Sequence, residues 1–314
     1  MKKFFPICFL FVILMACSGG SDDEGSPATP DPEPVTEEPA DDPVDEPSMV
    51  ELPEVNNLGF DLSAADLEGW ELVWEDNFSD DLSQWNIWTG GAFNNELQFY
   101  QQENLHLDNG YLFIEQKREF ANGPTNPFDN TNKNFDFTSG RIESKATYGP
   151  QQQEGSLRIS ARIKLPAGEG LWPAFWSYGD PWPVQGEIDV MEFRGGNTEE
   201  YVSNYFFGTT ANMPLTNSSM TTNTHQAGVD LTAEFHVFEV IWSPDTLVMY
   251  FDGNPIVTYE EPQFPFIQDF ANKRENIVLN MAVGGVFFNG MGLNENEIPS
   301  TSFLVVDWVK VHRQ

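Results

Sequence analysis

The body of the chain alternates between apolar and polar residues with a period of two. In SLRISARIKL, residues 156–165, every second residue from Leu157 is apolar and its neighbours are polar or small, which is typical of a strand with one buried face. The run TLVMYFDGNPIVTYE, residues 246–260, predicts a hairpin that turns near Asp252 and Gly253. The runs NIVLNMAV and FLVVDWVKV predict two further strands, and residues 264–272 predict one short helical turn. The pattern predicts an all-β fold, either a sandwich of two antiparallel sheets or a barrel.

The first 17 residues, MKKFFPICFLFVILMAC, have two lysines followed by a short apolar run. This is typical of a secretory signal, because the run is shorter than the roughly 20 residues that a spanning helix needs. Its end resembles a bacterial lipobox, which predicts a lipoprotein signal peptide over residues 1–16 and lipidation of Cys17. An ordinary cleavable signal and a short anchor helix are the alternatives. Cys8 would leave with the signal, so we expect a domain without disulfides.

Residues 17–56 are rich in Pro, Asp and Glu and contain no Lys or Arg. Such a segment buries too little apolar surface to fold, and its like charges extend it. We therefore expect a disordered tether over residues 17–56 and a catalytic domain over residues 57–314. The predicted location is the bacterial cell envelope, lipid-anchored, at the outer membrane and facing either the periplasm or the outside.

The chain is strongly acidic, with 49 Asp and Glu against 15 Lys and Arg. The segment from Asp22 to Glu54 holds 13 of the acids, so 36 acids against 13 bases remain for the body. A body this negative repels nucleic acid and anionic lipid, which favours a neutral partner. Sulfated polymers are not excluded as partners, since a local basic patch or high salt overcomes the repulsion from the protein's net negative charge. We expect the body to be a monomer.

The run QGEIDVMEF, residues 185–193, places three carboxylates in an otherwise apolar strand. Glu187 and Asp189 share a face of a regular strand, whereas Glu192 should point the opposite way. One extra residue near Val190 and Met191, a β-bulge, would turn Glu192 round to the same face. The sequence therefore predicts a bulge there.

Three adjacent carboxylates suit the cleavage of glycosidic bonds. Paired carboxyls act as nucleophile and acid/base, and close neighbours separate the two pKa values that these roles need. A divalent-metal site and a solvated acidic edge strand are the alternatives, but calcium sites more often gather their acids in a loop. The run GLWPAFWSYGDPWP adds Trp172 and Trp176 on one strand face, where they form either core or a stacking platform for sugar rings.

The order of motifs resembles glycoside hydrolase family 16, in the form of the bacterial laminarinases (endo-β-1,3-glucanases). Residues 187–192 match the family's E-x-D-x-x-E signature. The runs WELVWEDNFSDDLSQW, NNELQFY, TSGRIESK, ARIKLPAGEGLWPAFW, FHVFEVIWSPDTLVMYFDG, LNMAVGG and VDWVKV follow in the family's order. The resemblance covers nearly all of residues 57–314.

This resemblance implies a concanavalin-like β-jelly-roll sandwich with a concave glycan cleft and a retaining double-displacement mechanism without a catalytic cofactor. It assigns Glu187 as the nucleophile, Glu192 as the acid/base and Asp189 as the assisting acid. It makes Trp172 and Trp176 cleft platforms, and it implies sugar binding by Asn95, Arg141 and Glu96. The implied substrate is β-1,3-glucan or mixed-linkage β-glucan.

The surroundings of Asp307 bear on a structural metal. Asp307 is predicted to share a strand face with Phe303, Val305, Val309 and Val311, so this carboxylate needs a partner. The resemblance implies a structural Ca²⁺ held by Asp307 and a backbone carbonyl near Gly110; a backbone or arginine hydrogen bond is the alternative.

The chain also departs from laminarinases at two places near the predicted cleft. It has SNYFFGTT, with Phe206, where they have a His-Tyr-Gly strand, and VFFNG where they have Trp-Pro-Gly. The alternatives are therefore a family 16 enzyme for agarose, porphyran or carrageenan, and a non-catalytic glycan-binding lipoprotein.

Overall fold

The fold is taken from a computed structural model that describes residues 50–150 and 155–314. The predicted signal peptide, Cys17 and most of the predicted tether lie outside the described residues. One compact unit covers Glu51–Gln314. Within the described part of the chain, no helix is both long and apolar enough to cross a membrane.

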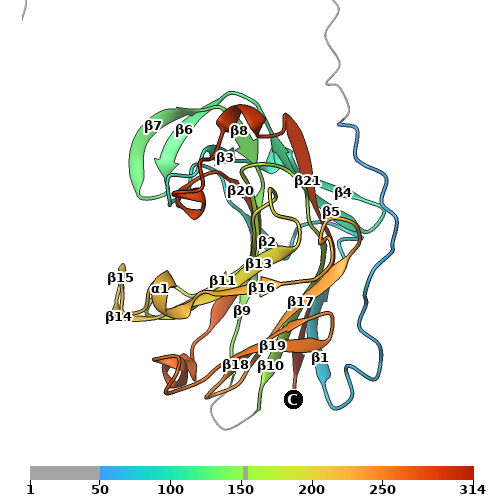
Figure 1. Cartoon of the computed structure of the whole chain (residues 1–314), viewed down its shortest axis with the longest axis vertical. Coiled ribbons are helices and arrows are strands. Elements are labelled where there is room, and N and C mark those ends of the chain that lie inside the picture. The colour runs from blue at the N-terminus through green and yellow to red at the C-terminus, as the bar shows by residue number, and fades with distance from the viewer. Residues whose placement is uncertain (1–49, 151–154) are drawn as a thin grey trace, which may run out of the picture. The chain divides into compact units, whose positions relative to one another are not determined.

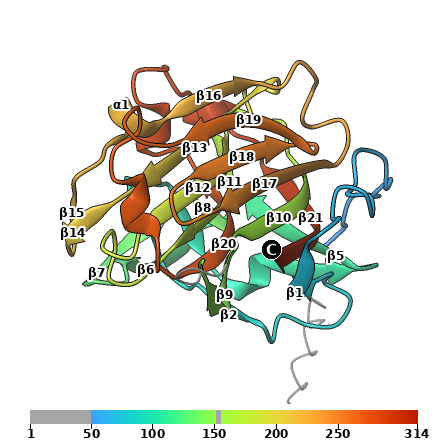
Figure 2. The ribbon, with the colours of Figure 1, turned by 90° about the horizontal axis from the view of Figure 1, so that it is seen from below.

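Two large sheets make up the body (Figures 1 and 2). The larger sheet has ten strands. In spatial order they are β19 (Asn254–Tyr259), β18 (Leu247–Phe251), β17 (His236–Trp242), β10 (Leu157–Lys164), β21 (Thr301–Arg313), β5 (Tyr111–Lys117), β8 (Phe137–Ser139) and β3 (Gln98–Tyr100), with β1 (Glu71–Asp76) beside β21 and β4 (Leu105–Asp108) beside β5. All pairs are antiparallel except β3 with β8.

The second sheet has seven strands, all antiparallel. Their order is β16 (Asn223–Gln226), β13 (Glu200–Phe206), β12 (Glu187–Phe193), β11 (Leu171–Tyr178), β20 (Glu275–Val283), β9 (Arg141–Tyr148) and β2 (Trp85–Ile87). The predicted all-β sandwich is thus confirmed. One face of this sheet packs on the ten-stranded sheet, and we call the other its cleft face.

Two small hairpins and short helices complete the described residues. The hairpins are β6 (Ala121–Asn126) with β7 (Asp129–Phe135) and β14 (Gly208–Thr210) with β15 (Met213–Pro214); the helices are α1 (Ser218–Thr221), η1 (Gln102–Asn104), η2 (Ile267–Phe270), η3 (Val286–Phe288) and η4 (Glu295–Glu297). Figure 1 shows both hairpins and α1 on one side of the molecule, with β6 and β7 above β14, β15 and α1. The single helical turn predicted within residues 264–272 corresponds to η2.

The core between the sheets is built from the apolar positions of the alternating strands. Leu157, Ile159, Ala161 and Ile163 of β10 are all buried there, as the alternation predicts. The 246–260 run forms the hairpin β18–β19. Asp252 and Gly253 both have positive φ, 47° and 73°, which is the turn that two-residue hairpins favour.

The polar side of β10 is also covered. Arg158 and Arg162 are buried, because residues 57–66 cross this face and supply carbonyl groups from Phe60 and Asp66 as acceptors. Leu52 and Val55 pack on an apolar cluster of Phe113, Phe235 and Val305 on the same outer face. The body therefore begins at Glu51, six residues before the predicted boundary, since these apolar side chains lie against the sheet.

Strand β21 contains a bulge that the sequence pattern missed. Arg162 pairs with Trp308 and Ile163 pairs with Val306, so Asp307 is the extra residue. Beyond it the parity changes, and Val309 and Val311 face the core while Val305 packs on the outer cluster. The prediction that Asp307 shares a face with Val309 and Val311 is therefore wrong.

Candidate active site

A bulge in β12 gathers the three predicted acids on the cleft face. Asp189 pairs with Asn204 of β13 and Glu192 pairs with Val202, so Val190 and Met191 together lie opposite one residue. The register toward β11 shifts at the same place. The predicted bulge is confirmed.

The pairing with β11 shows that the three acids share one face. Glu187 lies opposite Tyr178, Asp189 opposite Trp176 and Glu192 opposite Ala174. Residues 174, 176 and 178 are two apart and project from the same face of their strand. The core face of β12 carries fully buried Ile188 and Met191 instead. Local sequence therefore produces the cluster, because apolar residues hold one side of the strand while the bulge rotates Glu192 to the other.

The acids are held where ionisation is costly. Burial raises the pKa of Glu187, and the charge on Glu192 raises it further, while the indole N–H of Trp182 and the guanidinium of Arg141 act in the opposite direction. Burial also raises the pKa of Asp189, as do the charges of Glu187 and Glu192. Glu187 and Asp189 therefore hold protons to a higher pH than isolated carboxyls do.

Glu192 has its own partners. Burial raises its pKa, whereas the indole of Trp172 and the cation of Arg194 favour its charged form. Trp172 Nε1 donates a hydrogen bond to Glu192 Oε1 over 3.0 Å. The negative charge of Glu96, like burial, raises the pKa of Glu192 and favours its protonated form. A carboxyl with a raised pKa and one fixed donor is suited to deliver a proton.

A fourth acid, Glu275, lies on the core side of the same sheet. It is fully buried, Ser177 Oγ donates a hydrogen bond of 2.6 Å to its Oε2, and its Oε1 has no hydrogen-bond partner among the described residues. Burial raises its pKa well above the ordinary range; Ser177 opposes this shift and the charge of Glu187 adds to it. Glu275 is therefore protonated and uncharged in the folded protein.

This state of Glu275 predicts a pH-dependent stability. Because its folded pKa is raised, its contribution is fully present below the unfolded pKa of about 4.3 and is lost as pH rises toward the folded pKa. Glutamine does not ionise, so the side chain in E275Q makes no pH-dependent contribution to stability. We expect the melting temperature of E275Q minus that of wild type to increase from pH 4.5 to pH 8, measured by thermal melts. A difference that stays constant across this range would contradict a protonated Glu275.

Trp176 is fixed by a chain of hydrogen bonds that begins at Asn280 on the same sheet face. Its Nε1 donates to Asn280 Oδ1 over 2.7 Å, Asn280 Nδ2 donates to Tyr100 OH over 3.0 Å, and Tyr100 OH donates to Glu96 Oε2 over 3.3 Å. Gln98 Nε2 donates to the same oxygen over 2.7 Å. The predicted sugar ligand Glu96 is thus a buried anchor of this network, while Trp176 keeps a partly exposed ring opposite Asp189.

Arg141 lies between two tryptophans on the cleft face. Its Cζ is 4.2 Å from the ring centroid of Trp88 and 4.9 Å from that of Trp176. Its Nε and a terminal nitrogen donate to Glu143 Oε1 over 2.9 and 2.6 Å, and Tyr178 OH donates to the other oxygen over 3.1 Å. Arg141 is therefore a held cation beside the acids, which agrees with its predicted place in the cleft.

Trp172 differs from the open platform that the sequence predicts. It is only 9% exposed, and the ring of Phe287 stacks on it at 4.5 Å between centroids and 18° between planes. The Cζ atom of Arg194 lies 3.6 Å from the centroid of the Phe287 ring. Phe287 therefore contacts both Arg194 and Trp172. The geometry makes Trp172 a donor to Glu192 with one ring face covered.

The remaining predicted residues are Asn95, Gly110 and Asp307. Asn95 is exposed, with a positive φ of 56°, in the loop between β2 and β3. Gly110 forms the turn between β4 and β5 with φ of 78°. Asp307 accepts a hydrogen bond of 2.5 Å from Arg162, which is the alternative that the sequence left open. Among residues 50–150 and 155–314 no group of three acidic, histidine or cysteine side chains could hold a metal, and Arg162 supplies the partner that the Asp307 carboxylate needs.

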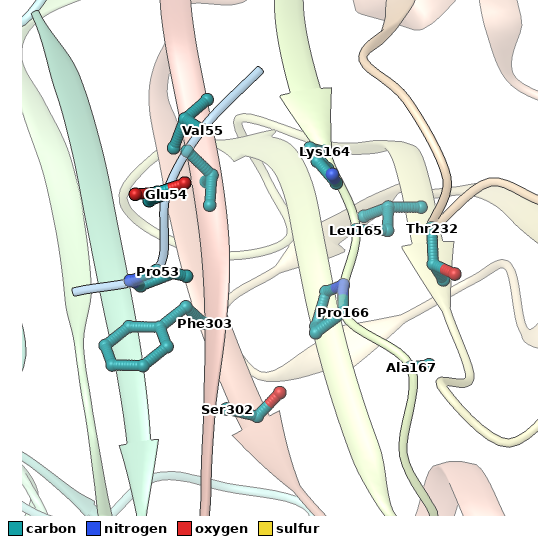
Figure 3. Close-up of a pocket in the computed structure, with 11 residues that line it drawn as sticks. Pro53, Glu54, Val55, Lys164, Leu165, Pro166, Ala167, Thr232, Ser302 and Phe303 are labelled. Atoms are coloured by element: carbon teal, nitrogen blue, oxygen red, sulfur yellow. The ribbon is translucent and has the colours of Figure 1, made fainter. Parts of the chain in front are cut away.

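A cavity of about 320 Å³ lies away from this chemistry, on the outer face of the ten-stranded sheet (Figure 3). It is lined mainly by apolar residues from the N-terminal segment, the end of β10 and β21, including Val55, Leu165 and Phe303. Glu54 is its one carboxylate, so the cavity lacks an acid pair. The acid cluster, rather than this cavity, is the candidate active site.

Sequence reasoning missed several residues that contact the acids or their neighbours. Trp182 and Phe287 were not assigned, although Trp182 stands in the aromatic run just before the motif and Phe287 stands in the VFFNG run. Glu143 follows Arg141 by two residues, the spacing that puts both on one strand face, and this signal could have found it. Phe206 lies opposite Glu187 on β13 and 6.2 Å from the ring of Trp182.

A sheet face with clustered, proton-holding carboxyls beside tryptophan, asparagine and arginine defines a glycoside hydrolase. Residues 83–308 match the family described as glycosyl hydrolases family 16, and the chain belongs to that family.

Several proteins with established names are similar to the chain. The glucan endo-1,3-beta-glucosidase of Cryptopygus antarcticus is 33% identical over 252 residues, which cover 73% of this chain and 86% of that protein. The glucan endo-1,3-beta-glucosidase A1 of Niallia circulans is 31% identical over 284 residues, 79% of this chain but 38% of that protein. The X-ray structure of endo-beta-1,3-glucanase from Pyrococcus furiosus superposes with a TM-score of 0.64 and 30% identity, covering 78% of this chain and 94% of that one.

Proposed function

We propose that this chain is a retaining endo-β-1,3-glucanase. The observation that carries the proposal is the β12 bulge, which places Glu187 and Glu192 on one face. The names of the similar proteins from Cryptopygus and Niallia support β-1,3-glucan as the substrate. The excess of acidic residues supports a neutral polymer. Mixed-linkage β-glucan is the nearest variation of this proposal.

The proposed reaction has two displacements. A carboxylate oxygen of Glu187 attacks the anomeric carbon while the bond to the leaving oxygen breaks, and Glu192 gives its proton to that oxygen. Glu192 then removes a proton from water, whose oxygen attacks the anomeric carbon and releases Glu187. Asp189, with its raised pKa, is placed between the two glutamates to share a proton with Glu187 during this cycle. Arg141 supplies positive charge beside the nucleophile.

A second candidate is a family 16 enzyme that cleaves a galactan. Phe206 opposite Glu187 and Phe287 over Trp172 favour it, since both stand where the sequence departs from laminarinases. A panel of laminarin, lichenan, agarose, porphyran and carrageenan, with sized products, separates the candidates. Short oligomers from laminarin support the proposal, and products from agarose or porphyran alone overturn it. Binding without new reducing ends would support a non-catalytic glycan-binding protein.

We also propose that the protein is lipid-anchored through Cys17 in the bacterial cell envelope. The lysines, the short apolar run and the lipobox-like end support this, together with the acidic segment that follows. Metabolic labelling with a fatty-acid analogue tests it, with C17S as the control variant. Label that persists in C17S would contradict the assignment.

The hydrogen bond from Trp172 predicts a shift in the pH profile. W172F removes the N–H that stabilises charged Glu192, so the pKa of Glu192 rises and the acid stays protonated to higher pH. We expect the alkaline limb of kcat/KM to move to higher pH in W172F, with a loss of about tenfold at the optimum. An alkaline limb that stays in place or moves to lower pH would contradict this role.

A further inference from the structure

Three aromatic side chains lie in a row beside the candidate active site. The ring centroids of Trp88 and Phe93 are 6.4 Å apart, and those of Phe93 and Phe128 are 5.8 Å apart. Trp88 is partly buried, Phe93 is 42% exposed and Phe128 is 84% exposed. We call these three residues the aromatic strip. Its exposure increases with distance from the acids, and a phenylalanine this exposed contributes little to the fold.

The aromatic strip is continuous with the site. Arg141 stacks on Trp88 on one side and on Trp176 on the other, and Trp176 lies opposite Asp189. Trp88 is fixed at this junction, because its Nε1 donates to the Gly91 carbonyl over 3.1 Å. A ligand that extends from the acids over Trp176 and Arg141 therefore meets Trp88 next.

The outer end of the strip is held by the β6–β7 hairpin. Gly91 N donates to the Pro124 carbonyl over 2.9 Å, and a Cβ on Gly91 would lie 2.2 Å from the Thr125 carbonyl oxygen, so the two segments pack closely. The rings of Phe99 and Phe135 also pack together at 5.3 Å. Figure 1 shows this hairpin at one margin of the side that also carries β14, β15 and α1. Phe128, in the hairpin's turn, is thus fixed next to Phe93.

We propose that the aromatic strip is an additional sugar-binding surface that holds rings of the same glucan chain beyond those over the acids. This inference rests on the proposed glucanase function. The apolar C–H faces of β-linked glucose stack on aromatic rings, and the hydroxyl groups need polar neighbours. Asn94 and Asn95 follow Phe93 directly, and the Asn126 side chain accepts from Phe128 N. The exposed amide of Asn95 is available to a sugar hydroxyl.

Length dependence tests the proposal. We compare kcat/KM for laminarioctaose and laminaritetraose in wild type, F128A, F128W and F120A. Phe120 is a matched control, since it is 67% exposed just before β6 and no ring of a described residue packs on it. We expect the octaose-to-tetraose ratio to fall about two- to tenfold in F128A. The ratio should recover in F128W and stay at the wild-type value in F120A.

The outcomes separate this inference from the proposed function. If wild type cleaves laminarioctaose and F128A keeps the wild-type octaose-to-tetraose ratio, the sugar-binding role of the aromatic strip is overturned and the glucanase proposal stands. Wild type that cleaves neither oligosaccharide overturns the glucanase proposal and the inference with it. Equal losses in F128A and F120A indicate a general effect on the hairpin and contradict the strip. Sedimentation completes the test: a dimer that F128A converts to a monomer assigns the exposed rings to a second copy and overturns the inference.

Discussion

Replacing Glu187 with glutamine should abolish hydrolysis of laminarin, with a loss of about 10⁴-fold or more in kcat, since an amide cannot form the glycosyl ester. The fold should persist, because glutamine is close in shape and removes a carboxyl whose pKa is raised by burial. Initial rates from reducing ends and a thermal melt measure the two effects. Full activity in E187Q would contradict the nucleophile assignment.

A smaller side chain at the same position makes this prediction sharper. In E187G, azide can enter the space of the carboxylate and attack the anomeric carbon of an activated β-glucoside. One displacement inverts the centre, so the expected product is the α-glycosyl azide. A β-glycosyl azide would show that Glu187 is not the group that attacks this carbon.

Replacing Glu192 with glutamine should lower kcat on laminarin by about 10²–10⁴-fold, the usual contribution of a positioned acid. The loss should depend on the leaving group. An oligosaccharide with a dinitrophenyl leaving group needs no proton, so formation of the glycosyl-enzyme should be nearly normal and give a burst of dinitrophenol. Equal losses for both substrates would contradict the acid role of Glu192.

D189N provides the comparison for both variants. Asp189 is buried between the glutamates of β12, its pKa is raised by burial and by their charges, and no part in bond breaking is assigned to it. D189N should reduce kcat less than E187Q does. Unlike the loss in E192Q, the loss of activity in D189N should not depend on the leaving group. A leaving-group dependence in D189N would move the acid role to Asp189.

The sequence predicts the fold and the acids because both depend on local patterns. Alternation in β10 and the apolar partners of β12 determine which side of each strand is buried. The bulge at Val190 and Met191 follows from parity alone, since three acids in an apolar strand must share a face to share chemistry. The bulge at Asp307 gave no such signal, because apolar residues occupy both parities around it.

Long-range contacts account for what the sequence did not predict. Phe287 covers Trp172 from a segment more than a hundred residues away, and nothing near Trp172 indicates this stack. Glu96 looks like an open polar residue, yet it is buried and accepts hydrogen bonds from Gln98 and Tyr100. Arg162 of β10 reaches Asp307 on the neighbouring strand β21 and satisfies the carboxylate that otherwise suggests calcium. Such pairings are decided by sheet order, which alternation does not encode.

The central claim is that the β12 bulge brings Glu187 and Glu192 to one face for a double displacement. The stereochemistry of the first product tests it most directly. Proton NMR during the first minutes of laminarin hydrolysis should show the β-anomer of the new reducing end, followed by mutarotation to the equilibrium mixture. Initial appearance of the α-anomer would mean a single displacement through water and would contradict the account.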